Sequence, residues 1–94
     1  MVKWICEGRL WWDKVNGNTY HSYQITDTKT NKVLFEQGMA YGGQGQWKHE
    51  VAKTLVKLGL LAEEDKFNYE KIGDWFFWTE STGLKRDMFK GLKV

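Results

Sequence analysis

The sequence predicts an α+β domain: an antiparallel sheet of about four strands, in the order β-β-β-α-β, with one main amphipathic helix packed on it. Three observations support this class. The first forty residues alternate like strands and contain two turn signals, one later segment has helical spacing, and a second apolar run follows it. With 94 residues and no linker or repeat, residues 1–94 are expected to form a single domain.

The first strand is expected over Val2–Trp12. Its apolar residues share one parity and should face the core, because side chains alternate between the faces of a sheet: Trp4, Cys6, Leu10 and Trp12. Gly8 in the middle of this run indicates a bulge or a close backbone approach.

Two turn signals separate the next strands. Asn16 and Gly17 are typical of a type I′ hairpin, in which both residues have positive φ. Thr19–Thr26 is the expected second strand, and Val33–Met39 the third, after a turn at Asp27–Lys32. These runs predict an antiparallel meander.

A helix is expected over Gln46–Leu58. Its apolar residues recur at helical spacing: Trp47, Val51, Leu55 and Leu58, with Ala52 beside them. Glu50 and Lys53 lie on the other side and can pair. Gly59 occupies the position of a helix-ending glycine, after which Leu60 can fold back in a Schellman motif.

The C-terminal third is predicted less sharply. Ala62–Gly73 reads as a connector, attached to the domain by three apolar side chains: Phe67, Tyr69 and Ile72. Asp74–Thr79 is the expected fourth strand, and its aromatic residues fall on both parities, which indicates that both faces are covered. From Ser81 onward, a short helix and an extension of the strand remain open alternatives.

Composition excludes several classes of protein. The formal net charge is +2, which is too small to predict nucleic-acid binding by itself. Cys6 is the only cysteine, so an intrachain disulfide and a thiolate zinc site from this chain are excluded, and a buried, inert thiol is expected. No apolar run is long enough to span a bilayer, and we expect a cytoplasmic protein.

The candidates for catalysis are few. His21 and His49 are the only histidines, and Ser22 should point to the opposite strand face from His21. The Gly42–Gly45 segment could cradle phosphate at a helix N-terminus, but it lacks the Gly-Lys-Ser/Thr ending of a P-loop and is better interpreted as a connecting loop. We therefore expect no enzyme, no metal site and no cofactor.

The aromatic excess is the compositional oddity, with 6 Trp, 5 Phe and 4 Tyr. Trp11 and Tyr20 fall on the parity opposite to the core-facing residues of their strands. Together with Tyr41 they are the candidate partner-binding residues, unless the helix or the C-terminal segment covers them. The candidates for nucleic-acid binding are basic: Lys48, Lys53, Lys57, Lys85 and Arg86.

Trp12–Ser22 reads Trp-Asp-Lys-Val-Asn-Gly-Asn-Thr-Tyr-His-Ser. It resembles a stretch of small uncharacterised proteins of tailed bacteriophages and prophages, which carry Trp-Phe-Asp-Lys-x-Asn-Gly-Asn-Thr-Tyr-His-Ser. Those proteins continue with a Tyr-Gly-Tyr-Gly-like motif and end in a basic stretch, matched here by Tyr41–Gly45 and Lys85–Met88. The second tyrosine is not kept here. The resemblance implies a viral origin and no particular activity.

A second similarity is to double-stranded-RNA-binding domains, whose second helix follows three strands and opens with Gly-x-Gly-x-Ser-Lys-Lys-x-Ala. The matching positions here are Gly43, Gly45, Lys48 and Val51. Trp47 replaces the serine and His49 the second lysine, and the helix that such domains place before the sheet is missing.

Two functions follow as expectations. The first is a small phage-type binding protein without catalysis, which inhibits a host defence complex such as a CRISPR effector in the host cytoplasm. The alternative is an RNA- or DNA-binding accessory module. The partner is expected to be a host macromolecule rather than a membrane, and the oligomeric state stays open.

Overall fold

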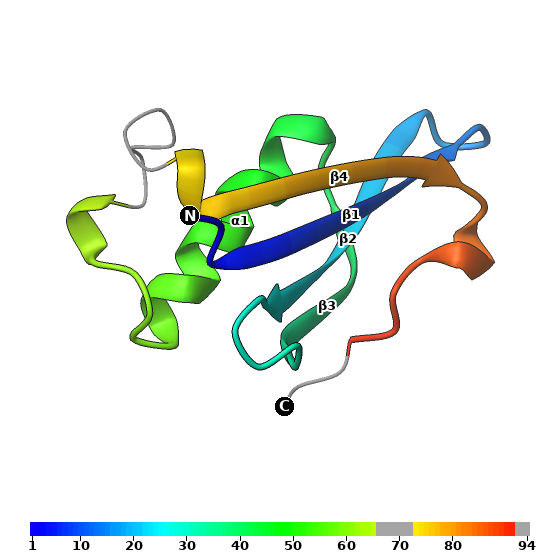
Figure 1. The fold of residues 1–94 in the computed structure, drawn as a ribbon. Helices are drawn as coiled ribbons and strands as arrows, with labels where there is room; N and C mark the ends of the chain where they lie inside the picture. The colour runs from blue at the N-terminus through cyan, green and yellow to red at the C-terminus, as the bar shows by residue number, and fades with distance from the viewer. Residues whose placement is uncertain (66–72, 92–94) are drawn as a thin grey trace.

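The computed structural model describes residues 1–65 and 73–91. They form one sheet and one α-helix (Figure 1), with bounds β1 (Trp4–Asp13), β2 (Asn18–Asp27), β3 (Val33–Tyr41), α1 (Gln44–Lys57) and β4 (Phe76–Gly83). Short 3-10 turns lie at η1 (Glu63–Asp65), η2 (Gly73–Trp75) and η3 (Lys85–Asp87). The predicted α+β class is confirmed. Phe67, Tyr69 and Ile72 of the expected connector lie outside the described residues.

The sheet has the order β3-β2-β1-β4. The first three strands form the expected antiparallel meander, but β4 pairs with β1 in parallel, with Trp4 beside Phe76. The course of α1 explains this difference. Helix α1 begins just after Tyr41, at the end of the sheet that carries the β1–β2 hairpin. Leu60, beyond the last turn of the helix, lies near Trp4 at the other end. The next strand therefore starts where β1 starts and runs in the same direction.

The first hairpin differs from the type I′ prediction. Asp13 pairs with Asn18, so the loop has four residues rather than two, and Gly17 is at φ +69° while Asn16 is not at positive φ. The Asp13 carboxylate accepts hydrogen bonds from the Val15 N–H at 3.0 Å and from the Asn16 side-chain amide at 2.8 Å. These bonds stabilise the wider loop, and the Asn16 side chain holds the pKa of Asp13 below its ordinary value.

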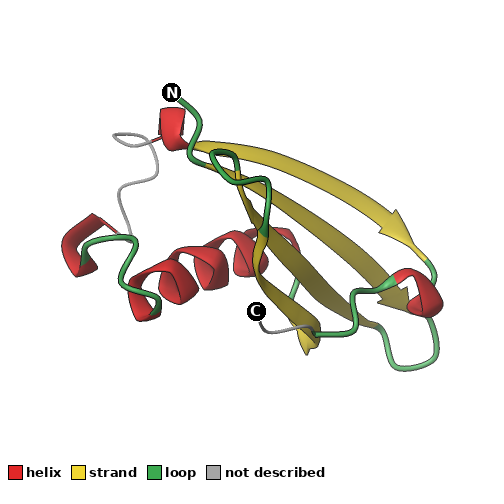
Figure 2. Ribbon diagram, turned by 60° about the horizontal axis from the view of Figure 1, so that its bottom comes forward, coloured by secondary structure: helices red, strands yellow, loops and turns green. Residues whose placement is uncertain are grey.

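Helix α1 packs its apolar face on one face of the sheet (Figure 2). The helix residues in the core are Trp47, Val51, Ala52 and Leu55; the sheet residues are Trp4, Cys6, Leu10, Tyr23, Ile25 and Phe76. The prediction for Leu58 is wrong: this C-cap residue is 43% exposed. The helix ends in the predicted Schellman motif, with Gly59 at φ +75° and the Leu60 N–H donating to the Leu55 carbonyl at 2.9 Å.

The indole ring of Trp47 lies directly on the backbone of Gly8, so a Cβ at position 8 would overlap the ring. The predicted close approach at Gly8 is confirmed. The ring is fully buried, its Nε1–H donates to the Glu80 carboxylate at 2.6 Å, and it meets Trp78 edge-on at a centroid distance of 5.5 Å. Trp47 thus joins the helix to β1 and β4 together.

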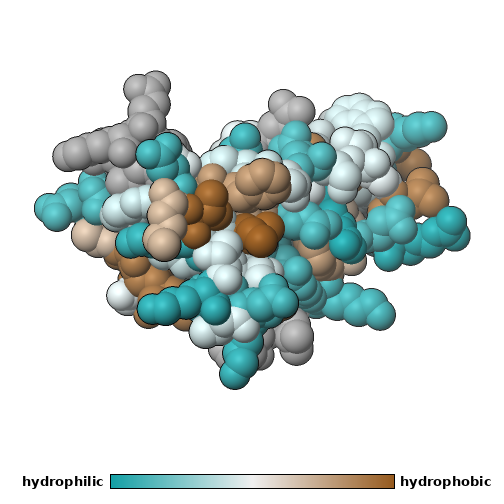
Figure 3. All heavy atoms as spheres, in the orientation of Figure 1, coloured by the Kyte–Doolittle hydropathy of each residue, from teal (hydrophilic) through white to brown (hydrophobic). Residues whose placement is uncertain are grey.

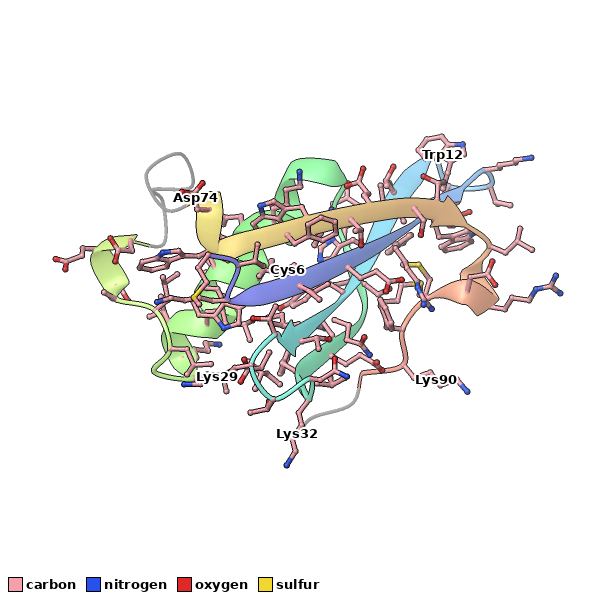
Figure 4. All side chains as sticks on the ribbon, viewed as in Figure 1. Cys6, Trp12, Lys29, Lys32, Asp74 and Lys90 are labelled. Carbon is pink, nitrogen blue, oxygen red and sulfur yellow. The ribbon has the colours of Figure 1, made fainter. Side chains whose placement is uncertain are left out.

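Two expected burials fail at the sheet margins. Trp12 shares the parity of the core but is 49% exposed, and Figure 4 shows it at the hairpin end, pointing away from the body. Phe77 is 53% exposed, so β4 is not covered on both faces. From Ser81 onward, the sequence left a strand extension and a short helix open, and both occur in turn. The strand continues to Gly83, and the one-turn η3 follows.

The C-terminal segment crosses the face of the sheet opposite to α1. The Phe89 N–H donates to the Ser22 hydroxyl at 2.9 Å, and the buried Met88 lies against the same hydroxyl. The Arg9 guanidinium stacks 3.9 Å from the Phe89 ring centroid and donates to the Asp87 carbonyl at 3.0 Å. Ser22 therefore points away from His21, as predicted.

The helix phase can be tested with two leucines. Leu55→Ala should lower the free energy of unfolding by roughly 2–5 kcal/mol, because Leu55 is fully buried. Leu58→Ala, the matched control one turn later, should cost less than about 1 kcal/mol, because its side chain is half in solvent. Chemical denaturation of both variants measures the difference, and equal losses would contradict the described core.

A glycine pair tests the contact with Trp47. Gly8→Ala should destabilise the fold by roughly 1–3 kcal/mol, because the new Cβ displaces the ring. Gly45→Ala meets no atom within 4 Å and lies in the helix, so the same change there should stabilise by up to about 1 kcal/mol. Thermal melts of the two variants should move in opposite directions.

Candidate functional site

Three aromatic residues form a continuous row across three strands, on the face opposite to α1. Trp11 in β1 pairs with Tyr20 in β2, which pairs with Tyr41 in β3. The Trp11 and Tyr20 rings stack at a centroid distance of 5.4 Å, and the Tyr20 and Tyr41 rings meet edge-on at 5.8 Å. We call these three residues the aromatic ladder. Such cross-strand pairs contribute about 0.5–1.5 kcal/mol each, which favours this arrangement of the three rings.

The ladder is open at one end and partly covered at the other. Tyr41 is 70% exposed, whereas Trp11 and Tyr20 are half-buried. Lys85 belongs to the segment that follows β4, and its ammonium group lies 5.6 Å from the Trp11 ring centroid. The sequence left open whether these aromatic residues are exposed or covered, and each holds for part of the ladder. The helix lies on the other face and does not cover them, whereas the C-terminal segment borders the ladder beside Trp11.

The five predicted basic residues do not gather on one surface. Lys85 and Arg86 are exposed in η3, and Lys85 lies beside Trp11. Lys48, Lys53 and Lys57 are on α1, on the opposite side of the sheet. Of these three, Lys48 lies 5.6 Å from the Trp78 ring centroid and Lys53 pairs with Glu50 at 3.5 Å, as predicted.

His21 is buried, with 1% of its surface exposed, on the helix side of β2. Its Nδ1 lies 3.1 Å from the Gly42 carbonyl oxygen, so Nδ1 carries the proton. Its Nε2 is also buried and has no hydrogen-bond partner among the described residues. His49 lies on α1 and is half-buried. The two histidines are thus placed separately, and Ser22 lies on the other face from His21.

A pocket of about 280 Å³ lies between α1 and the end of β3. Its lining is polar and aromatic: His21, Tyr23, Gln37, Ala40, Tyr41, Gln46 and Glu50. The loop before the helix is bonded to β2, because the Gly42 N–H donates to the Thr19 carbonyl at 3.0 Å while the Gly42 carbonyl meets His21. The backbone of Gly42 is thus bonded within the domain, which fits the interpretation of Gly42–Gly45 as a connecting loop rather than a phosphate cradle.

Within residues 1–65 and 73–91, no cluster of three or more His, Cys, Asp or Glu side chains could hold a metal ion. In the same part of the chain, no helix is long and apolar enough to cross a membrane.

Sequence reasoning missed a second exposed apolar pair. Ile5 and Phe77 are register neighbours on the helix-free face and are 38% and 53% exposed. Figure 3 shows apolar side chains gathered on this face over β1 and β4. The available signal was the parity of Phe77, which is opposite to that of the core residue Phe76 and of Trp78, which packs against the core. The neighbour of Phe77 could not be named without the β1–β4 pairing.

Comparison with models of known protein families, with curated proteins and with solved structures found no match.

The burial of Cys6 makes its reactivity a measure of unfolding. Burial raises the pKa of Cys6 to about 12, so the folded thiol should resist iodoacetamide at pH 8 and react on addition of denaturant. Because only the unfolded thiol ionises between about pH 9 and 12, the stabilising contribution of Cys6 is complete below this window and is lost as pH rises through it. A Val15→Cys variant, changed at a 92% exposed position, should react at its new thiol without denaturant. Fast labelling of native Cys6 would contradict its burial.

Proposed function

We propose that this protein acts by binding a host protein through the aromatic ladder and performs no chemistry itself. The observation that carries the proposal is the assembly of Trp11, Tyr20 and Tyr41 into one row with an exposed end. Trp and Tyr are enriched among the residues that dominate binding energy, and their rigid side chains lose little entropy when a partner immobilises them.

A protein partner is favoured by the apolar surroundings of the ladder. Exposed apolar residues adjoin it in sequence or register at the same end of the sheet: Val15, Met39 and Leu84. Apolar side chains exposed together are typical of protein interaction sites. The small net charge of +2 also fits a protein partner better than a polyanion.

The class of partner rests on the resemblance to phage proteins. That resemblance supports a viral protein that works in the host cytoplasm, and the partner we propose is a host defence complex such as a CRISPR effector. Inhibitors of this kind are compact and block a target by covering its surface. An aromatic row with an apolar margin is suited to that role, because it can occupy a complementary surface without a catalytic step.

Nucleic-acid binding is the second candidate, favoured by the position of Lys85 beside Trp11. Single-stranded nucleic acids bind where bases stack on aromatic rings and phosphates meet basic side chains. The similarity to double-stranded-RNA-binding domains involves Lys48 on α1, which lies on the opposite side of the sheet from Lys85. The ladder with Lys85 and Arg86 would therefore be the surface for this second function.

Alanine at the exposed end of the ladder tests the proposal. Tyr41→Ala should weaken capture of the host partner by about tenfold or more, because tyrosine is enriched among the interface residues whose truncation costs about 1.4 kcal/mol or more of binding energy. Leu60→Ala is the matched control, since Leu60 is 46% exposed at the opposite end of the sheet. The partner is captured from host lysate with the parent protein, purified, and its affinity for each variant measured by interferometry.

The same variants separate the two candidates. In the nucleic-acid case, Lys85→Glu and Arg86→Glu should weaken single-strand binding and reduce the log–log salt slope by about one per lost phosphate contact. An unchanged affinity of Tyr41→Ala for its ligand would count against the ladder. If a single substitution of His21, His49 or Cys6 abolished activity while folding and capture persisted, the binding-only proposal would fail.

A further inference from the structure

Strand β4 is an open edge of the sheet. It pairs with β1 over eight residue pairs in unbroken register, from Trp4 and Phe76 to Trp11 and Gly83. Among the described residues, backbone hydrogen bonds outside the regular elements involve none of Phe76–Gly83. Figures 1 and 2 show β4 as the outermost strand, with α1 on one side of the sheet. No strand among the described residues therefore pairs with the outer N–H and C=O groups of β4.

The opposite edge of the sheet is protected in ways that β4 is not. The pairing of β3 with β2 contains two register shifts, and Lys90 and Gly91 lie against Gly38 of β3. Strand β4 has no proline, no basic residue and no register shift. Its single charged residue, Glu80, accepts the hydrogen bond of Trp47. A regular edge of this length, with only one charged residue, is one that a monomeric protein usually blocks.

We propose that a second copy of this chain pairs its β4 antiparallel to the first, so that the two sheets join into one. The same edge then meets itself across a two-fold axis, which is the commonest way in which identical chains associate. Residues directly opposite each other in an antiparallel pair share a face of the sheet. One residue of β4 must therefore lie directly opposite its own copy, with the two-fold axis midway between the two. We call this the residue on the axis.

Charge selects Thr79 as that residue. With Thr79 on the axis, Glu80 lies opposite Trp78 of the second copy, and the Lys48 ammonium of that copy lies 5.6 Å from the Trp78 ring centroid. Each carboxylate then approaches an ammonium group, twice by symmetry. An axis through Glu80 would oppose two carboxylates, and one through Trp78 would place Glu80 against the buried Phe76.

The position of α1 is compatible with this arrangement. Helix α1 packs mainly on β1 and β2 and reaches β4 through the Trp47 and Lys48 side chains. On the helix-free face, Phe77 would lie opposite Ser81 of the second copy and lose part of its 53% exposure. The two aromatic ladders, each centred on strands away from the joint, would stay uncovered at opposite ends of the joined sheet.

A pair of cysteine variants tests both the dimer and its register. Thr79→Cys places the two introduced thiols opposite each other at about 5 Å between Cα atoms, within disulfide range. Mild oxidation should give a covalent dimer in high yield, and the buried Cys6 should not take part. Ser81→Cys is the matched control: its two copies would be four residues apart along the strands, roughly 13 Å, and should stay monomeric on the gel. Equal cross-linking of both variants, or of neither, would overturn the register.

Sedimentation across a concentration series tests the association itself. The parent chain should approach twice its 11.1 kDa mass as concentration rises. Two variants should each raise the dimer dissociation constant by roughly two- to thirtyfold, because two ion pairs are lost: Lys48→Glu and Glu80→Gln. Glutamine at position 80 keeps an acceptor for the Trp47 N–H. Lys57→Glu on the exposed last turn of α1 should leave it unchanged. A chain that stays monomeric up to millimolar concentration refutes the dimer and leaves the edge to a strand of another protein.

Discussion

The fold depends on the contact between the Trp47 ring and the bare backbone of Gly8. Because Gly8 has no side chain, the largest residue of the helix can lie flat on β1 and reach Glu80 and Trp78 in β4 with its edge. One side chain therefore sets the height of the helix above the sheet and fixes the position of the last strand. In a domain of 94 residues, whose core is necessarily thin, such an interaction accounts for a large part of the specificity of the packing.

The sequence predicted what is determined locally. The helix phase, the close approach at Gly8, the positive φ of Gly17 and the helix-ending Gly59 follow from periodicity and from the special freedom of glycine. The direction of β4 was not accessible, because it depends on where the helix ends in space. Trp12 and Leu58 follow the right period but lie beyond the ends of the surfaces that would cover them, and periodicity does not report those ends.

The candidate site shows the same division. The parity of Trp11 and Tyr20 placed them on one face, and the strand pairing then brought Tyr41 alongside. The five basic residues were grouped by charge alone, and the sheet now separates the helix lysines from Lys85 and Arg86. The open edge of β4 could not be predicted, since an edge is defined by the absence of a neighbour and not by any residue in the strand.

The parallel pairing of β4 also has a consequence for how the chain acquires its structure. Trp4 pairs with Phe76, 72 positions later, whereas the two hairpins join strands that are neighbours in sequence. Long loops are closed late because their entropy cost must be met before contacts form. We therefore expect the side of β1 that faces β4 to be paired last, after the meander has formed.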